Sequence, residues 1–211
     1  MENQQQSIRS EIYLVLATLY RQAPSAEMIE FLAQLETEPS NSKMKIAWDR
    51  LKAAALASDT QMLTDEYQEL FIGIGRGEVM PFASWHLTGS LMEKPLAAIR
   101  HDLTRLGFER AESVKEPEDH ISALCEVMAA LVSEEENLQQ AFFNTHIAPW
   151  FELLIKQILQ AKHASFYLCV AELTHAFLTV EQVRFSEHHS SNKTTLKVDV
   201  KNVTEYEQPQ P

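Results

Sequence analysis

Glycine and cysteine are scarce in this chain of 211 residues. Only five glycines and eight prolines occur, too few for the many tight turns of an all-β protein. The two cysteines, Cys125 and Cys169, lie inside apolar helical patterns. Because of these positions we interpret them as reduced core residues of a cytosolic protein.

Long apolar runs and basic residues are also lacking. No uninterrupted apolar stretch approaches the roughly 18 residues of a membrane span, and residues 1–10 contain no apolar signal segment. We therefore expect a soluble cytoplasmic protein. Lysine and arginine total 18 against 30 acidic residues, which gives a net charge of −12. Such a surface repels nucleic acid and anionic lipid, and it favours basic partners.

The sequence lacks the common motifs of metal and nucleotide sites. Neither His-Glu-x-x-His nor Cys-x-x-Cys occurs, so no metal site is predicted. The segment from Gly73 to Gly77 contains three of the five glycines but lacks the Gly-Lys-Ser/Thr end that holds phosphate and magnesium. Two interpretations stay open for it: weak phosphate contact through Arg76, or a simple flexible loop.

Helical periodicity is what the chain does have, with 45% hydrophobic residues recurring at i, i+3 and i+4. It predicts an all-α fold of about nine to ten helices. Ser25 and Asp59 are placed as N-caps of two helices, and Gly107 is placed to end another.

The periodic segments fall into two groups. We expect an N-terminal helical half over residues 1–107, a hinge over 108–118, and a C-terminal helical half over 119–185. The polar tail, 186–211, is predicted to be disordered. An extended hinge would allow two copies to exchange halves and form a swapped homodimer.

Two segments interrupt this pattern and are the candidates for a binding site. Phe82 and Trp85 lie in an irregular aromatic stretch, predicted as a loop lining a groove for an apolar segment. Glu116, Glu118 and Asp119 precede an apolar helix and could attract the basic end of a peptide. The competing interpretation is an ordinary helix N-terminus, with a proline in its first turn and acids on its dipole.

His120 follows these acids and could be a phosphoacceptor or half of an acid/base pair. No serine or cysteine nucleophile motif accompanies it, so catalysis is not expected.

The interrupted segments, taken together, resemble the TorD/DmsD/NarJ family of redox-enzyme maturation chaperones. Three blocks carry the resemblance. The first is Tyr67-x-x-Leu70-Phe71-x-Gly73 followed by Pro81-Phe82-Ala83-Ser84-Trp85-His86-Leu87. The second is Glu116-Pro117-Glu118-Asp119-His120-Ile121, and the third is His146-x-x-Pro149-Trp150 with Phe166-Tyr167. Within this family the sequence most resembles the TorD branch, whose client is trimethylamine N-oxide reductase.

The resemblance implies an all-helical cytoplasmic chaperone and no enzyme activity. Family members bind the twin-arginine signal peptide of a molybdoenzyme and hold its apo-core until the molybdenum cofactor is inserted, before export. Implied partners are therefore this precursor and the cofactor delivery machinery. No cofactor is expected to bind stably, although weak guanine-nucleotide binding is attributed to the TorD branch.

The residues that match the family's peptide site come from the first two blocks. They are Phe82, Trp85, His86, Leu87, Glu116, Pro117, Asp119 and His120. The chain departs from the family pattern at Ala83, where glutamate is usual, and at Trp85-His86, where Val-Tyr is usual. We expect Asp119→Ala to weaken client binding with little loss of fold.

Two functions of other classes remain as alternatives. One is a small nucleotide-binding or nucleotide-hydrolysing protein that uses the Gly73–Gly77 loop and His120. The other is a helical adapter for a different basic partner.

Overall fold

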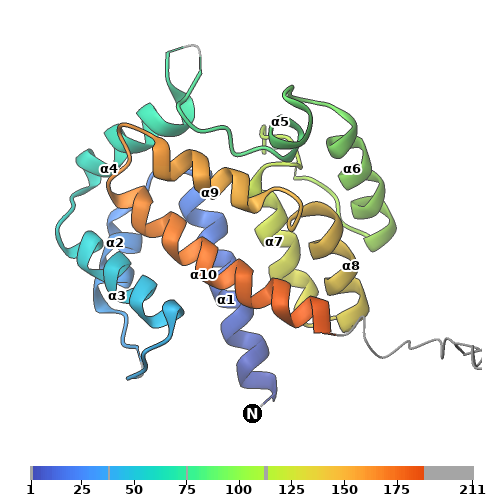
Figure 1. Ribbon diagram of the computed structural model, residues 1–211, viewed down its shortest axis with the longest axis horizontal. Coiled ribbons are helices and arrows are strands. Elements are labelled where there is room, and N and C mark those ends of the chain that lie inside the picture. Colours follow the sequence, from blue (N-terminus) through green and yellow to red (C-terminus); the bar gives the residue numbers. More distant parts are fainter. Residues whose placement is uncertain (1, 38, 75, 112–113, 188–211) are drawn as a thin grey trace, which may run out of the picture.

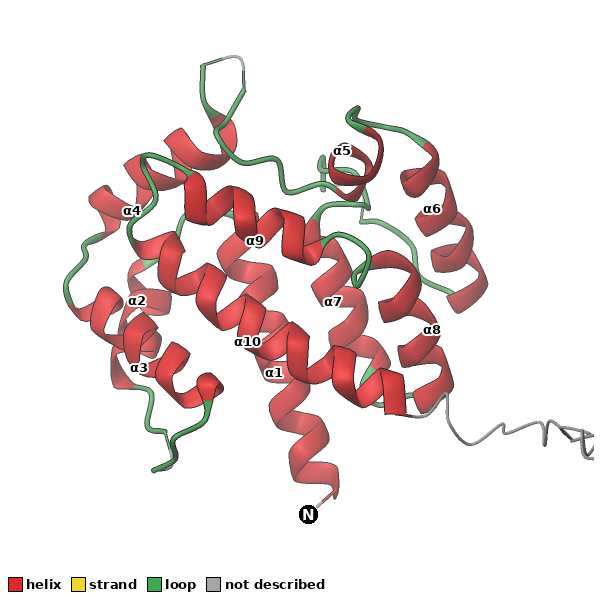
Figure 2. Cartoon of the chain, viewed as in Figure 1, coloured by secondary structure: helices red, strands yellow, loops and turns green. Residues whose placement is uncertain are grey.

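The chain is described by a computed structural model that covers residues 2–37, 39–74, 76–111 and 114–187 (Figure 1). Within these ranges the regular elements are all helices, so the predicted all-α class is confirmed (Figure 2). In chain order they are α1 (Glu2–Arg21), α2 (Ala26–Gln34), α3 (Lys43–Leu56), α4 (Thr60–Tyr67), the π-helical turn η1 (Gln68–Ile72), α5 (Ala83–Thr88), α6 (Lys94–Leu106), α7 (Ile121–Leu131), α8 (Glu136–His146), α9 (Phe151–Gln160) and α10 (Phe166–Glu187).

Local signals set several helix ends as the sequence predicts. The N–H of Met28 donates to Ser25 Oγ at 3.3 Å, and the N–H of Met62 donates to Asp59 Oδ1 at 2.9 Å. Gly107 ends α6 in the left-handed conformation, with φ of 79°. These boundaries follow from capping chemistry that lies within a few residues of each helix end.

Helices from both predicted halves share one hydrophobic core. Helix α1 packs along α7, and α10 packs along α3 and α9. In Figure 1, α10 crosses in front of α1 near the centre of the molecule. The residues that join the halves are irregular over 108–111 and 114–118, and 112–113 of this connector lie outside the described residues. Its role as a hinge, and the exchange of halves between two copies, stay predictions.

The last helix is slightly longer than predicted. Helix α10 continues to Glu187, so the C-terminal helical half extends two residues beyond its predicted end at residue 185. The rest of the predicted tail, 188–211, lies outside the described residues. No helix in the described part of the chain is both long and apolar enough to span a bilayer.

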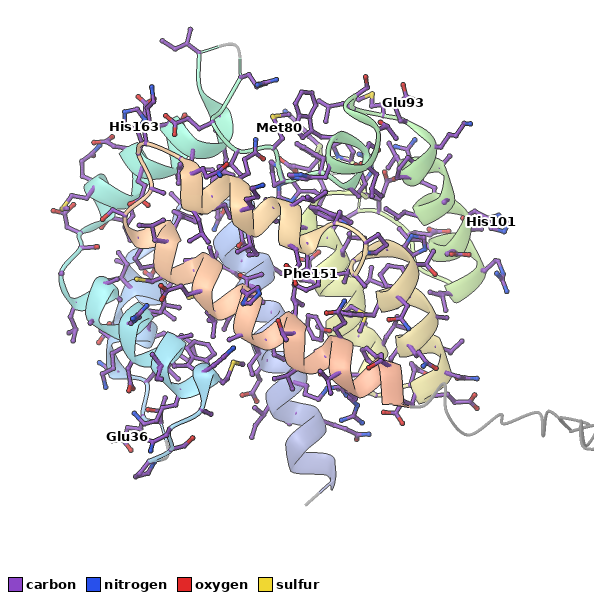
Figure 3. The ribbon with its side chains drawn as sticks, in the orientation of Figure 1. Glu36, Met80, Glu93, His101, Phe151 and His163 are labelled. Atoms are coloured by element: carbon purple, nitrogen blue, oxygen red, sulfur yellow. The ribbon has the colours of Figure 1, made fainter. Side chains whose placement is uncertain are left out.

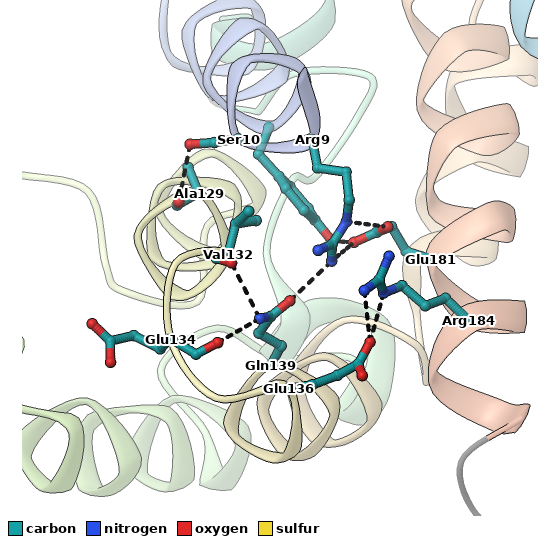
Figure 4. Close-up of polar contacts among 10 residues, drawn as sticks. Arg9, Ser10, Ala129, Val132, Glu134, Glu136, Gln139, Glu181 and Arg184 are labelled. Atoms are coloured by element: carbon teal, nitrogen blue, oxygen red, sulfur yellow. Dashed lines mark hydrogen bonds and ion pairs between the residues drawn. The ribbon is translucent and has the colours of Figure 1, made fainter. Parts of the chain in front are cut away.

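A polar cluster is buried where α1, α8 and α10 meet (Figure 4). Arg9 donates from Nε and Nη2 to the two carboxylate oxygens of Glu181, at 2.9 and 2.7 Å, and from Nη2 to Gln139 at 3.0 Å. The Tyr13 hydroxyl donates to the same carboxylate at 2.9 Å. Arg9 is 6% exposed and Glu181 is 1% exposed, so each charge depends on the other inside the core.

Candidate peptide-binding site

The two interrupted segments lie side by side in the fold. The N–H of Ala83 donates to the carbonyl of Asp119, and the N–H of Ile121 donates to the carbonyl of Pro81, both at 2.9 Å. These bonds form an isolated antiparallel bridge between Phe82 and His120, whose rings meet edge to face with centroids 5.0 Å apart. The structure therefore brings the first and second motif blocks together.

The predicted aromatic loop is partly wrong, because residues 83–88 form the short helix α5. Its N-cap residue, Phe82, offers no side-chain hydrogen bond. The missing bond comes from Asp119, whose Oδ2 accepts from the N–H of Ser84 at 2.9 Å. A cap supplied from a distant position in the sequence is invisible to periodicity, which explains the error.

The helix that follows the second block does not include the proline in its first turn. Helix α7 starts at Ile121 with His120 as its N-cap. Pro117 therefore lies in the preceding turn, where its carbonyl accepts from the N–H of His120 at 3.1 Å, and not in the first helical turn. Pro117 and Glu118 are partly exposed in this turn.

Asp119 and His120 are buried, with exposed fractions of 1% and 4%. The imidazole Nδ1 of His120 accepts from the backbone N–H of Ser122 at 3.1 Å and lies 2.7 Å from its hydroxyl. Burial, with a smaller contribution from Arg21, lowers the pKa of His120 to about 3. Both residues are buried and hydrogen-bonded to neighbouring backbone N–H groups. We therefore expect Asp119→Ala to disturb the fold locally, in contrast to the expectation from the sequence.

The neutral, buried imidazole predicts a specific loss of stability in acid. The unfolded chain binds a proton at His120 below its ordinary pKa near 6.5, whereas the folded chain does so only near pH 3. Proton binding therefore favours the unfolded state as pH falls from about 6.5. For this group we expect a loss of about 2 kcal/mol between pH 7.5 and pH 5, measured by urea unfolding.

The matched variant is His120→Asn, which keeps an N-cap acceptor but cannot be protonated. Its stability should fall less steeply over the same pH range. Equal slopes for the variant and the original chain would contradict the burial of a neutral imidazole.

The aromatic segment presents one face to solvent and one to the core. Trp85 is half-buried, and the Arg76 guanidinium carbon lies 4.8 Å from its ring centroid. Leu87 is 43% exposed. His86 turns inward: it donates from Nε2 to the carbonyl of Met80 at 2.7 Å and stacks on Trp150 with centroids 5.3 Å apart. Met80 and Glu93 mark the region of this segment at the upper edge of Figure 3.

Trp150 belongs to the third motif block, so this block contacts the first block at α5. Its indole N–H donates to the carbonyl of His146 at 2.6 Å, and Trp150 itself is fully buried. Burial lowers the pKa of His86, the residue that stacks on it. The third block is therefore a buried support for the segment that contains Trp85.

A cavity of about 320 Å³ opens beside the second block, between the end of α1, α6, α7 and the connector. Its apolar lining comes from Leu103, Phe108, Ala111, Val114, Ala123 and Val127. Its charged lining comes from Glu109, Glu116, Glu118, Glu126, Arg21 and Arg110. Four carboxylates against two guanidinium groups leave an excess of negative charge at an apolar cavity.

The chain's own arginines already pair with two of these carboxylates. Arg21 binds Glu126 through two hydrogen bonds, one of them 2.7 Å long between Nη2 and Oε2. Arg100 binds Glu118 at 2.8 and 2.9 Å, and Arg110 approaches it at 3.5 Å. Partial burial opposes ionisation of Glu118, but the Arg100 hydrogen bond and both positive charges lower its pKa.

Glu109 and Glu116 remain exposed and form no ion pair with any residue that the structure describes. Arg21 interacts electrostatically with Glu116 but makes no ion pair with it. An incoming cation could therefore bind Glu109 or Glu116 without displacing a hydrogen-bonded partner. Of the two, sequence reasoning found Glu116 and missed Glu109. The apolar residues in the charged connector, Phe108 and Val114, were the signal that could have marked this segment as part of a site.

The glycine-rich loop has a structural reason for its composition. Gly73 has φ of 61°, and a Cβ there would lie 2.2 Å from the carbonyl oxygen of Arg76. A Cβ on Gly77 would lie 2.4 Å from the carbonyl oxygen of Leu70. Gly75 lies outside the described residues. His120, which the nucleotide alternative pairs with this loop, is buried. Weak guanine-nucleotide binding stays a prediction.

Comparisons with known proteins agree on one family. A family model described as nitrate reductase delta subunit matches residues 37–156. The chaperone protein TorD of Vibrio parahaemolyticus is 24% identical over 198 residues, covering 82% of this chain and 92% of that protein. The protein named probable Tat proofreading chaperone DmsD of Haemophilus influenzae is 26% identical over 181 residues, covering 82% of this chain and 89% of that protein.

One solved structure shows the same fold. It is the crystal structure of a protein from Archaeoglobus fulgidus assigned to redox enzyme maturation, with a TM-score of 0.56 and 19% sequence identity. The match covers 82% of this chain and 93% of that one.

Proposed function

This chain belongs to the nitrate reductase delta subunit family of redox-enzyme maturation chaperones, and we propose that it binds the twin-arginine signal peptide of a molybdoenzyme precursor. The relatives are named as chaperones and not as catalysts, so a binding function replaces the hydrolase alternative.

The observation that carries the proposal is the cavity beside α7, which has an apolar lining and the exposed carboxylates Glu109 and Glu116. A guanidinium group can bind a carboxylate through two parallel hydrogen bonds, whereas an ammonium group cannot. Arginine side chains of the client bind these acids, and the adjoining apolar part packs against the cavity lining and the exposed face of α5, which includes Trp85 and Leu87.

We further propose a specific client and a place of action. The client is the precursor of trimethylamine N-oxide reductase, and the chaperone acts in the cytoplasm. By holding both the signal peptide and the apo-core, it delays export until the molybdenum cofactor has been inserted. The net charge of −12 supports this function, because it favours a basic client segment.

Calorimetric titration with a synthetic twin-arginine leader of that reductase tests the proposal. We expect saturable binding that weakens about tenfold when the two arginines are replaced by lysines, because the paired hydrogen bonds are lost. Glu116→Gln should weaken binding of the arginine leader by a similar factor and have little effect on the lysine leader.

The matched control is Glu36→Gln, which removes one exposed carboxylate at the opposite edge of the molecule (Figure 3). It should leave the affinity unchanged if the effect of Glu116 is local and not a consequence of net charge. Failure of the arginine leader to bind the original chain would reject the proposed function. A panel of other basic peptides would then test the adapter alternative.

A further inference from the structure

Helix α5 depends on the second motif block for its N-terminus. It has only six residues, and its own N-cap residue supplies no side-chain acceptor. Instead, Asp119 uses two oxygens: its carbonyl accepts from Ala83 N–H and its Oδ2 accepts from Ser84 N–H, each at 2.9 Å. Asp119 therefore satisfies two adjacent N–H donors at the start of a helix it does not belong to.

A helix this short is not stable by itself. Closing the first turn fixes several backbone dihedrals for one hydrogen bond, so isolated helices below about 12 residues are marginal in water. The position of α5 is consequently set by its surroundings, namely the bonds to Asp119, the Phe82–His120 bridge and packing on α6. Trp85 and Leu87 belong to this helix and form the apolar part of the candidate site, so their positions depend on the position of α5.

Asp119 itself is poorly placed to contact a client. Asp119 is 1% exposed, and its Oδ2 accepts a hydrogen bond from the Ser84 N–H. A client guanidinium at the surface reaches Glu109 and Glu116 first, because both are exposed. Pairing with Asp119 would require the client to enter the core and would leave the Ser84 N–H without its acceptor.

We infer that Asp119 is a positioning residue, which supports client binding by fixing α5 and its Trp85 and not by pairing with an arginine of the client. The inference rests on the proposed function, since it assigns a role within that binding site. If Asp119 acts in this way, client affinity depends on the acceptor oxygen of residue 119 and not on its charge. A direct ion pair would instead require the charge.

Two substitutions at residue 119 separate these cases. Asp119→Asn keeps an oxygen acceptor for the Ser84 N–H and removes the charge, whereas Asp119→Ala removes both. Binding of the twin-arginine leader is measured by calorimetry, and hydrogen exchange of residues 83–88 is measured on the same full-length variants. We expect Asp119→Ala to weaken binding at least tenfold and to speed exchange in α5, while Asp119→Asn stays within about threefold of the original chain in both.

The inference is overturned if Asp119→Asn weakens leader binding as strongly as Glu116→Gln while α5 keeps its original protection. That result would identify a direct charge contact. The asparagine variant decides the question even if the alanine variant does not fold. If the leader binds no form of the protein, the proposed function fails. Slow exchange in α5 of Asp119→Asn would still support the role of the residue 119 oxygen in fixing α5.

Discussion

Replacing Arg9 with alanine should lower the free energy of unfolding by about 3–5 kcal/mol. The substitution leaves the Glu181 carboxylate buried in the core, where the Tyr13 hydroxyl is its one remaining donor among the residues that the structure describes. Removing one partner of a buried ion pair is costly because the remaining charge cannot be solvated. Urea unfolding at neutral pH, followed by circular dichroism, measures the loss.

Two controls separate the buried charge from general packing. The double variant Arg9→Met with Glu181→Leu removes both charges, so it should recover much of the stability lost in Arg9→Ala. Arg50 pairs with Glu172 at the surface, and Arg50→Ala should change stability little. If the double variant were as unstable as the single one, the uncompensated charge would not be the cause.

The second large effect is expected at Leu124, which is fully buried in α7. Leu124→Ala should cost about 2–5 kcal/mol, because the lost apolar contacts leave a cavity that the core refills only in part. Leu159→Ala is the matched control, since it makes the same chemical change on α9 at a residue that is 52% exposed. That variant should stay within about 0.5 kcal/mol of the original chain in the same urea titration.

A large loss in both leucine variants would contradict the burial of Leu124 and the exposure of Leu159. It would mean that the exposed face of α9 is covered in solution. A small loss in both would place α7 outside the core.

Much of the fold follows from local patterns. Apolar residues at helical spacing reveal a helix wherever one face is buried, and Ser25, Asp59 and Gly107 act within a turn of the helix ends that they set. For this reason the all-α class and the N-terminal helices could be predicted. The short α5 could not, because its cap comes from Asp119 and not from its own sequence.

The segments that form the candidate site could be predicted from the sequence, but the burial of their side chains could not. The order of motifs identified the segments around Phe82 and Glu116, and the structure places these segments together. Burial of Asp119 and His120 depends on how the connector packs on α5 and α7, which no local pattern encodes. The pairing of Arg21 with Glu126 was missed for the same reason, since 105 positions separate the two residues.

Hydrogen exchange of the full chain, measured with and without the twin-arginine leader, locates the client on the surface of the protein. We expect the leader to slow exchange in α5 and in the described residues of the connector, with no change along α3 and α9. In Glu116→Gln this protection should require a higher leader concentration. Protection confined to α3 and α9, with α5 and the connector unchanged, would contradict the proposed site.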